Sequence, residues 1–109
     1  MRAGRLRARV TIQERGLSRN ELGEALADWS TVATVPADVR MASGDERFVG
    51  GGDVEQASIT HVVRMRYRSD VTPLERLLHG ERVLDIVSAV DPDGRRRELV
   101  LRCVERLAA

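Results

Sequence analysis

The chain has 109 residues, which fits a single domain built around one hydrophobic core. Its 18 basic and 17 acidic residues give a formal net charge of +1, so the overall charge does not predict indiscriminate binding to nucleic acid. Cys103 is the single cysteine, which excludes an intrachain disulfide and a cysteine-based zinc cluster. Every basic residue is arginine. GC-rich coding explains that bias, and so does the good fit of the planar guanidinium to carboxylates at protein interfaces.

The first residues carry positive charge, but no apolar segment follows them. No window approaches the roughly 18 consecutive apolar residues that a membrane span needs. We therefore expect neither a signal peptide nor a transmembrane helix. The single cysteine fits a chain that is made inside a cell.

Residues 5–14 alternate between apolar and polar side chains, and this period of two predicts a first strand. Residues 15–28 are mostly polar and contain two glycines, which predicts a long hairpin loop. Within that loop Ser18 and Glu21 match a capping box, although the segment is too short for more than about one turn of helix.

Residues 29–41 are rich in β-branched side chains and predict a second strand with Pro36 in its middle. Proline has no amide hydrogen to donate to a neighbouring strand. The strand is therefore expected to lie at a sheet edge there, or to bend near Val35 and Pro36 as at the corner of a barrel.

Residues 42–58 predict an insertion between strands that is longer than a connecting turn needs. Ser43 and Glu46 have the spacing of a capping box, which predicts a short helix carrying Phe48 and Val49. The three glycines at 50–52 then permit almost any backbone course. Loops of this length are commonly functional or mobile.

The C-terminal half predicts a meander of strands over 59–68, 82–90 and 96–105, with a strong turn signal at 91–94. Residues 74–78 fit either a short strand or a helical turn, because periodicity cannot decide over five residues. The predicted fold is mainly β. It is a small antiparallel β-barrel or sandwich, with one short helix in a long inter-strand insertion, forming a single domain over 1–109.

The stretch THVVRMRYR, residues 60–68, alternates almost without exception, so its two faces differ in chemistry. The inward face is expected to hold His61, Val63, Met65 and Tyr67. The outward face is expected to carry a row of three guanidinium groups, those of Arg64, Arg66 and Arg68.

Three interpretations of this arginine row are open. It can be a solvated face that protects the sheet from edge association. It can contact phosphates, but small nucleic-acid-binding barrels usually add exposed aromatic side chains, and this chain has only Trp29, Phe48 and Tyr67. The favoured functional interpretation is a protein interface, in which the row meets carboxylates of a neighbouring subunit.

The sequence predicts no enzyme, no cofactor and no metal site. It lacks HExxH and GxSxG motifs, and Gly50–Gly52 are not followed by the GK[ST] of a phosphate-binding loop. His61, His79 and Cys103 could be read as metal ligands. A half-buried strand histidine, a turn histidine and a core thiol are far more ordinary interpretations of these three residues.

Four stretches, taken in order, resemble the phage head–tail joining family, also called head-closure or stopper proteins, of tailed phages, prophages and gene transfer agents. They are MRAGRLRARVTIQ, LGEALADWSTVATVPADVR, SGDERFVGGGDVEQASITHVVRMRYR and VLDIVSAVDPDGRRRELVLRCVE. The resemblance covers nearly the whole chain, and it is specific as an ordered set although no single motif is diagnostic.

The resemblance implies a small β-barrel subunit that assembles as a ring below the portal and adaptor. Such a ring closes the channel through which double-stranded DNA leaves the head, and it offers a surface to tail terminator or tail tube proteins. The location implied is the head–tail connector of a virion or phage-like particle, assembled in the bacterial host cytoplasm. The isolated chain can be monomeric, because ring interfaces often form only on a preassembled template.

By the same resemblance, the insertion holds the loop that faces the channel or a neighbouring subunit. The residues expected there are Ser43, Glu46, Arg47, Phe48, Gly50, Gly51 and Gly52. The arginine row is the expected subunit interface, and near-zero net charge suits a protein that lets DNA pass rather than holding it. The alternative function is a small nucleic-acid-binding β-barrel.

Overall fold

The computed structural model describes residues 6–19, 21–23, 25–46 and 58–106, and the side chains within them except those of 17–19 and 25–27. Six antiparallel strands close into a barrel in the order β1-β2-β3-β6-β5-β4. The strands are β1 (Ala8–Arg19), β2 (Ala25–Met41), β3 (His61–Arg66), β4 (Arg76–His79), β5 (Arg82–Val90) and β6 (Glu98–Arg106). The mainly β, barrel-type fold predicted from alternation is confirmed.

The barrel interior holds the side chains that alternation placed on the inward faces. Val63 of β3 lies opposite Leu101 of β6, and both side chains have 0% of their surface exposed. The whole core cluster is Val10, Ile12, Ala37, Val63, Met65, Val71, Leu77, Leu84, Ile86, Leu99, Leu101 and Cys103. Tyr67 packs against this cluster, and His61 is 4% exposed, so the predicted inward face of 60–68 is confirmed.

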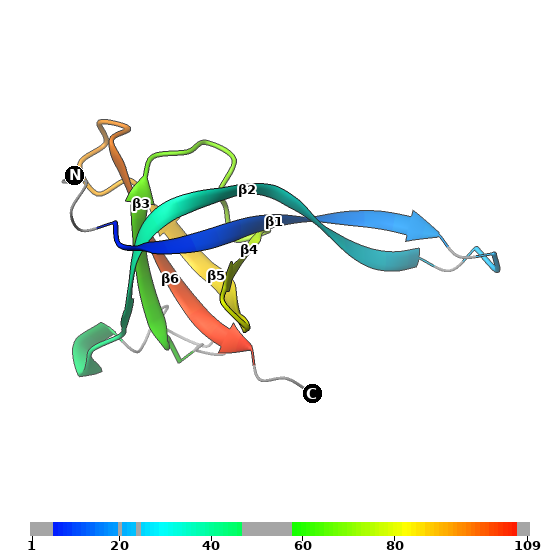
Figure 1. Ribbon diagram of the computed structural model, residues 1–109, viewed down its shortest axis with the longest axis horizontal. Helices are drawn as coiled ribbons and strands as arrows, with labels where there is room; N and C mark the ends of the chain where they lie inside the picture. Colours follow the sequence, from blue (N-terminus) through cyan, green and yellow to red (C-terminus); the bar gives the residue numbers. More distant parts are fainter. Residues whose placement is uncertain (1–5, 20, 24, 47–57, 107–109) are drawn as a thin grey trace, which may run out of the picture.

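Strands β1 and β2 continue well beyond the barrel. Among the described residues, β1 pairs with β4 only over Thr11–Gln13, and β2 pairs with β3 only over Ala37–Met41. Beyond Gln13 the two strands pair only with each other, and we refer to Glu14–Arg19 and Ala25–Ser30, together with the segment 20–24 that joins them, as the arm. The register shifts between Ile12 and Gln13, a bulge that marks where the arm leaves the barrel. Figure 1 shows the arm projecting to one side of the barrel.

The predicted long hairpin loop over 15–28 is therefore wrong. Ser18 lies in β1 opposite Leu26, so it caps no helix, and the strands are joined by the short segment around Gly23, whose φ is 80°. The strands in this segment were missed because alternation of apolar and polar residues detects only a strand that buries one of its two faces. A two-stranded ribbon that projects from the core buries neither face, so both faces can be polar.

Three further segments refine the prediction. Pro36 lies in an unbroken β2 at a position paired with β1 alone, so its missing amide hydrogen costs no bond to β3. Residues 76–79 form strand β4, which decides between the strand and helical turn left open for 74–78. The last strand begins at Glu98 instead of residue 96, because the β5–β6 turn is longer than its Asp-Pro-Asp-Gly signal indicates.

Candidate functional site

The stem of the insertion is fixed by one glutamate. Glu46 accepts hydrogen bonds from the Ser43 amide at 3.0 Å and the Ser43 hydroxyl at 2.9 Å. Both Glu46 carboxylate oxygens also lie 2.6 Å from the guanidinium nitrogens of Arg40 on β2. The Arg40 bond and then the Ser43 bonds hold the pKa of Glu46 well below its usual range. The predicted pairing of Ser43 with Glu46 is present.

The helix that this pairing opens is short. Within the described residues it is a single 3₁₀ turn, Gly44–Glu46. The other predicted loop residues, Arg47, Phe48 and Gly50–Gly52, lie outside the described residues. Their role as a channel-facing or neighbour-facing loop stays a prediction.

The insertion leaves and re-enters the barrel at adjacent points. The Ala42 amide donates to the Thr60 carbonyl at 2.9 Å, and the Thr60 amide donates to the Cys103 carbonyl of β6 at 2.9 Å. The Thr60 hydroxyl accepts a bond from the Glu105 amide at 2.7 Å. Hydrogen bonds thus hold the two ends of the insertion to each other and to β2 and β6.

The predicted arginine row is divided by the structure. Arg64 donates to Glu98 on β6 at 3.0 Å, and Arg68 forms a two-pronged pair with Asp70 at 2.8 and 3.0 Å. The Arg68 bond lowers the pKa of Asp70. Arg66 is exposed, and no ion pair joins it to another residue in the described part of the chain. Only Arg66 therefore keeps a guanidinium available to a neighbouring molecule.

A second group of arginines, which the sequence analysis did not single out, lies beside Arg66. The β5–β6 turn carries Arg95, Arg96 and Arg97, all exposed, and the Arg97 carbonyl accepts a bond from the Tyr67 amide at 3.2 Å. We refer to Arg66 with Arg95–Arg97 as the basic turn. The run RRR that follows the turn signal indicates this group. The sequence analysis missed it because the last strand was predicted to begin at residue 96, within the run.

The backbone of the basic turn is held by two aspartates. Asp91 accepts bonds from the amides of Gly94 at 3.1 Å and Arg96 at 2.8 Å, while Asp93 accepts from the Arg95 amide at 3.0 Å. Arg96 has a φ of 59°, a left-handed conformation that is uncommon for a side chain of this size. The carboxylates bind backbone amides, so the arginine side chains are presented outward on a fixed frame.

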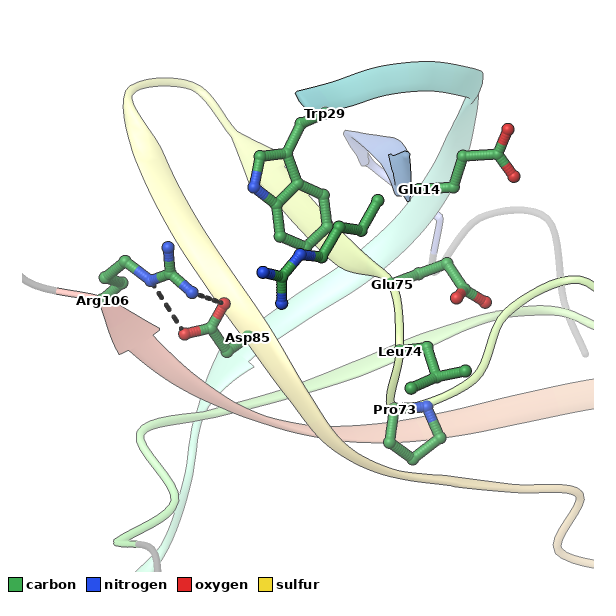
Figure 2. A pocket seen from close by; sticks show the side chains of 8 residues that line it. Glu14, Trp29, Pro73, Leu74, Glu75, Asp85 and Arg106 are labelled. Atoms are coloured by element: carbon green, nitrogen blue, oxygen red, sulfur yellow. Dashed lines mark hydrogen bonds and ion pairs between the residues drawn. The ribbon is translucent and has the colours of Figure 1, made fainter. Parts of the chain in front are cut away.

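A groove lies where the arm meets the barrel. It has a volume of about 660 Å³ and is lined by residues of the arm, of the turn before β4, of β5 and of β6: Glu14, Arg15, Trp29, Pro73, Leu74, Glu75, Asp85 and Arg106. Figure 2 shows Trp29 over the groove, the Arg106–Asp85 pair on one side and Pro73 with Leu74 on the other. The guanidinium of Arg76 lies 4.1 Å from the centre of the Trp29 ring and donates to Gln13 at 2.9 Å. These contacts fix the root of the arm.

The Cys103 thiol and the His61 imidazole are buried, while His79 is half-buried in β4. Burial raises the pKa of the Cys103 thiol to about 12, so the nucleophilic thiolate is scarce near neutral pH. His61 is buried and lies 2.9 Å from the Thr60 hydroxyl, and burial lowers its pKa. Across the described residues no three histidine, cysteine or carboxylate side chains gather as metal ligands, and no helix is long and apolar enough to cross a membrane.

Comparison with known proteins then decides the family. The sequence matches the family described as "Phage head completion protein" over residues 1–106. The chain belongs to the phage head completion protein family. The head completion protein gp7 of Enterobacteria phage HK97 is 35% identical to this chain over 109 residues. The match covers 94% of this chain and 96% of that protein. The family resemblance found in the sequence is confirmed.

Solved structures agree with the barrel. The solution structure of protein SF1141 from Shigella flexneri 2a is 33% identical, covers both chains completely and superposes with a TM-score of 0.77. A chain in the virion of a native gene transfer agent particle superposes with a TM-score of 0.66 over 95% of this chain and 98% of that one. Its 22% identity supports a shared fold.

Proposed function

We propose that the chain is a structural connector subunit that completes the head of a phage or phage-like particle. The match to the head completion family over residues 1–106 carries this proposal. Copies of the chain form a ring that closes the DNA channel below the portal and adaptor, and the ring offers its outer end to tail proteins. The subunit works within the virion after assembly in the bacterial cytoplasm, and its partners are other virion proteins and the double-stranded DNA that passes through.

The proposed role needs contacts more than chemistry, and several features support it. The barrel is a closed sheet of paired strands, and the insertion stem, the arm and the basic turn lie at the ends of those strands. Rings of identical subunits repeat one heterologous contact, which requires two different surfaces on each copy. Within the insertion over 42–58, we place Ser43, Glu46, Arg47, Phe48 and Gly50–Gly52 toward the channel or a neighbour, and we place Arg66 toward a neighbouring subunit.

Particles assembled without this chain test the proposal. Filled heads should accumulate without tails, or should lose DNA, and wild-type protein supplied in trans should restore tailed particles in electron micrographs. A ring at the head–tail junction should appear only when the protein is supplied. Normal tail attachment in its absence would falsify the proposed function.

The basic turn favours a second candidate, direct binding of nucleic acid. Three exposed arginines on the β5–β6 turn, with Arg66 of β3 beside them, suit a contact with phosphates, which bind mainly through charge. A mobility shift with double-stranded DNA at physiological salt tests this function. Retardation that disappears in Arg95→Glu/Arg97→Glu protein would support it, and free migration of the DNA would count against it.

A further inference from the structure

The arm lacks what a stable two-stranded ribbon needs. Two strands without a third strand or a packed face are marginal in water. Among the described residues each arm strand is paired along one edge only, so its other edge offers unpaired backbone groups. Glu14, Arg15, Asp28 and Ser30 are exposed, and Leu22 beside the tip is 82% exposed. We therefore expect the arm to be stabilised by contact with a partner surface.

The arm and the basic turn carry opposite charge. The segment 14–28 contains four acidic residues, Glu14, Glu21, Glu24 and Asp28, against Arg15 and Arg19, a net charge of −2. The four arginines of the basic turn, counted with the two aspartates that hold its backbone, Asp91 and Asp93, have a net charge of +2. Among the described residues no ion pair joins the four arginines to a carboxylate. The two regions are complementary and equal in magnitude.

Their positions prevent contact within one copy. The longest dimension of the chain is 49 Å, and Figure 1 shows the arm at one end of this axis and the β5–β6 turn at the other. Two complementary surfaces at opposite ends of one subunit can meet only between copies. Such a head-to-tail contact repeats identically, and it closes when the rotation between copies divides a full turn.

We propose that the arm of each copy lies against the basic turn of the next copy, and that this contact joins neighbours around the ring. The proposal rests on the proposed ring and names its contact. Glu21 and Asp28, which are exposed on the arm, face the guanidinium groups of Arg95 and Arg97 on the neighbour. Arg66, the residue of the predicted arginine row that is not paired within the described part of the chain, lies at the margin of the same contact. The arm of the neighbouring copy is its partner there.

A charge-swap experiment in assembling particles tests this contact. Arg95→Glu/Arg97→Glu and Glu21→Arg/Asp28→Arg should each lower the yield of tailed particles about tenfold or more, because like charges then meet in every interface. The four substitutions together should restore most of the yield. The matched control combines the turn variant with Asp38→Arg/Glu81→Arg, which makes the same change of charge at residues outside the arm, the insertion and the basic turn. The control should not restore it.

Crosslinking gives a second measurement that does not depend on rescue. Cys103 is buried and its thiol is largely protonated, so we expect the wild-type chain to form no disulfide crosslinks that would obscure those of engineered cysteines. Leu22→Cys/Arg96→Cys protein, oxidised in tailed particles, should form a ladder of linked copies, while either substitution alone should form dimers at most. Absence of the ladder together with absence of rescue overturns the proposal.

The outcomes separate the proposal from its rivals. If the turn variant fails in assembly and loses retardation of double-stranded DNA, while the arm variant assembles normally, the basic turn contacts DNA and the proposal is wrong. If the protein is required for tail joining but the swap shows no rescue and no ladder, the head-completion function stands and only the arm contact fails. Tails that join without the protein remove the function itself.

Discussion

The barrel and the arm are built partly from the same two strands, yet they depend on different partners. In the barrel, β1 is paired on both edges over Thr11–Gln13 and β2 is paired on both edges at Ala37, and the side chains of Val10, Ile12 and Ala37 lie in a core where their exposure is 0%. In the arm the same strands have one paired edge each, and their described side chains are largely exposed. Closure of the sheet, and not strand sequence alone, separates a self-sufficient element from one that needs a neighbour.

The largest expected effect lies in the barrel core. Leu101→Ala removes a fully buried side chain from the middle of β6 and leaves a cavity, so the free energy of unfolding should fall by about 2–5 kcal/mol. Urea unfolding followed by circular dichroism measures this loss. Val90→Ala, at a strand residue that is 43% exposed, is the control and should cost about 0.5 kcal/mol or less. Equal effects of the two changes would contradict the assigned core.

A smaller effect is expected at the junction of barrel and arm. Trp29→Ala removes the ring that lies against the Arg76 guanidinium, a contact worth about 0.5–1 kcal/mol at a partly exposed site. Hydrogen exchange should become faster at amides of the arm, while the protection of β3 and β6 should stay nearly unchanged. Trp29→Phe keeps an aromatic face and should retain part of the protection. A uniform change over arm and barrel would show that the two regions unfold as one unit.

The barrel should also respond to pH through His61. Burial lowers the pKa of His61 below the 6.5 of an exposed histidine, so the unfolded chain binds the proton more readily than the folded one. Stability from this residue is therefore complete above about pH 6.5 and is lost as the pH falls below that value. The urea midpoint should drop more between about pH 7.5 and pH 5.5 in the wild type than in His61→Gln protein. Parallel pH profiles would exclude His61 as the source.

The smallest expected effect is at the arm tip. Leu22 is 82% exposed, so Leu22→Ser should change the free energy of unfolding of the isolated chain by about 0.5 kcal/mol or less. In particles the same substitution should weaken the joining of neighbours if the arm makes the intersubunit contact. A large loss of stability in the isolated chain would show that the tip already packs within one copy.

Alternation predicted the barrel walls well and failed where burial departs from a simple two-sided strand. Strand 82–90 was predicted with the bounds of β5, and the inward residues of β3 are buried as expected. Val62, which alternation places on the same face as Arg64, is 1% exposed, so burial in this strand is not confined to one face. The arm was mistaken for a loop, since a ribbon solvated on both faces carries no alternating signal.

The candidate surfaces divide in the same way. The Ser43–Glu46 spacing indicated the stem of the insertion, because a capping interaction is local in sequence. The arginine row was recognised, but the sequence could not show that Glu98 and Asp70 occupy Arg64 and Arg68. Glu98 lies 34 residues away from Arg64 along the chain, so only strand pairing brings it near.

The sequence by itself determined a small single-domain β-protein, its family and most of its core, because the alternation of side chains and the order of segments are properties of the chain. Tertiary structure decided which strands close the barrel, where β1 and β2 leave it, and which arginines remain available at the opposite end. Those outcomes depend on pairings between residues far apart in sequence, and no local pattern encodes them.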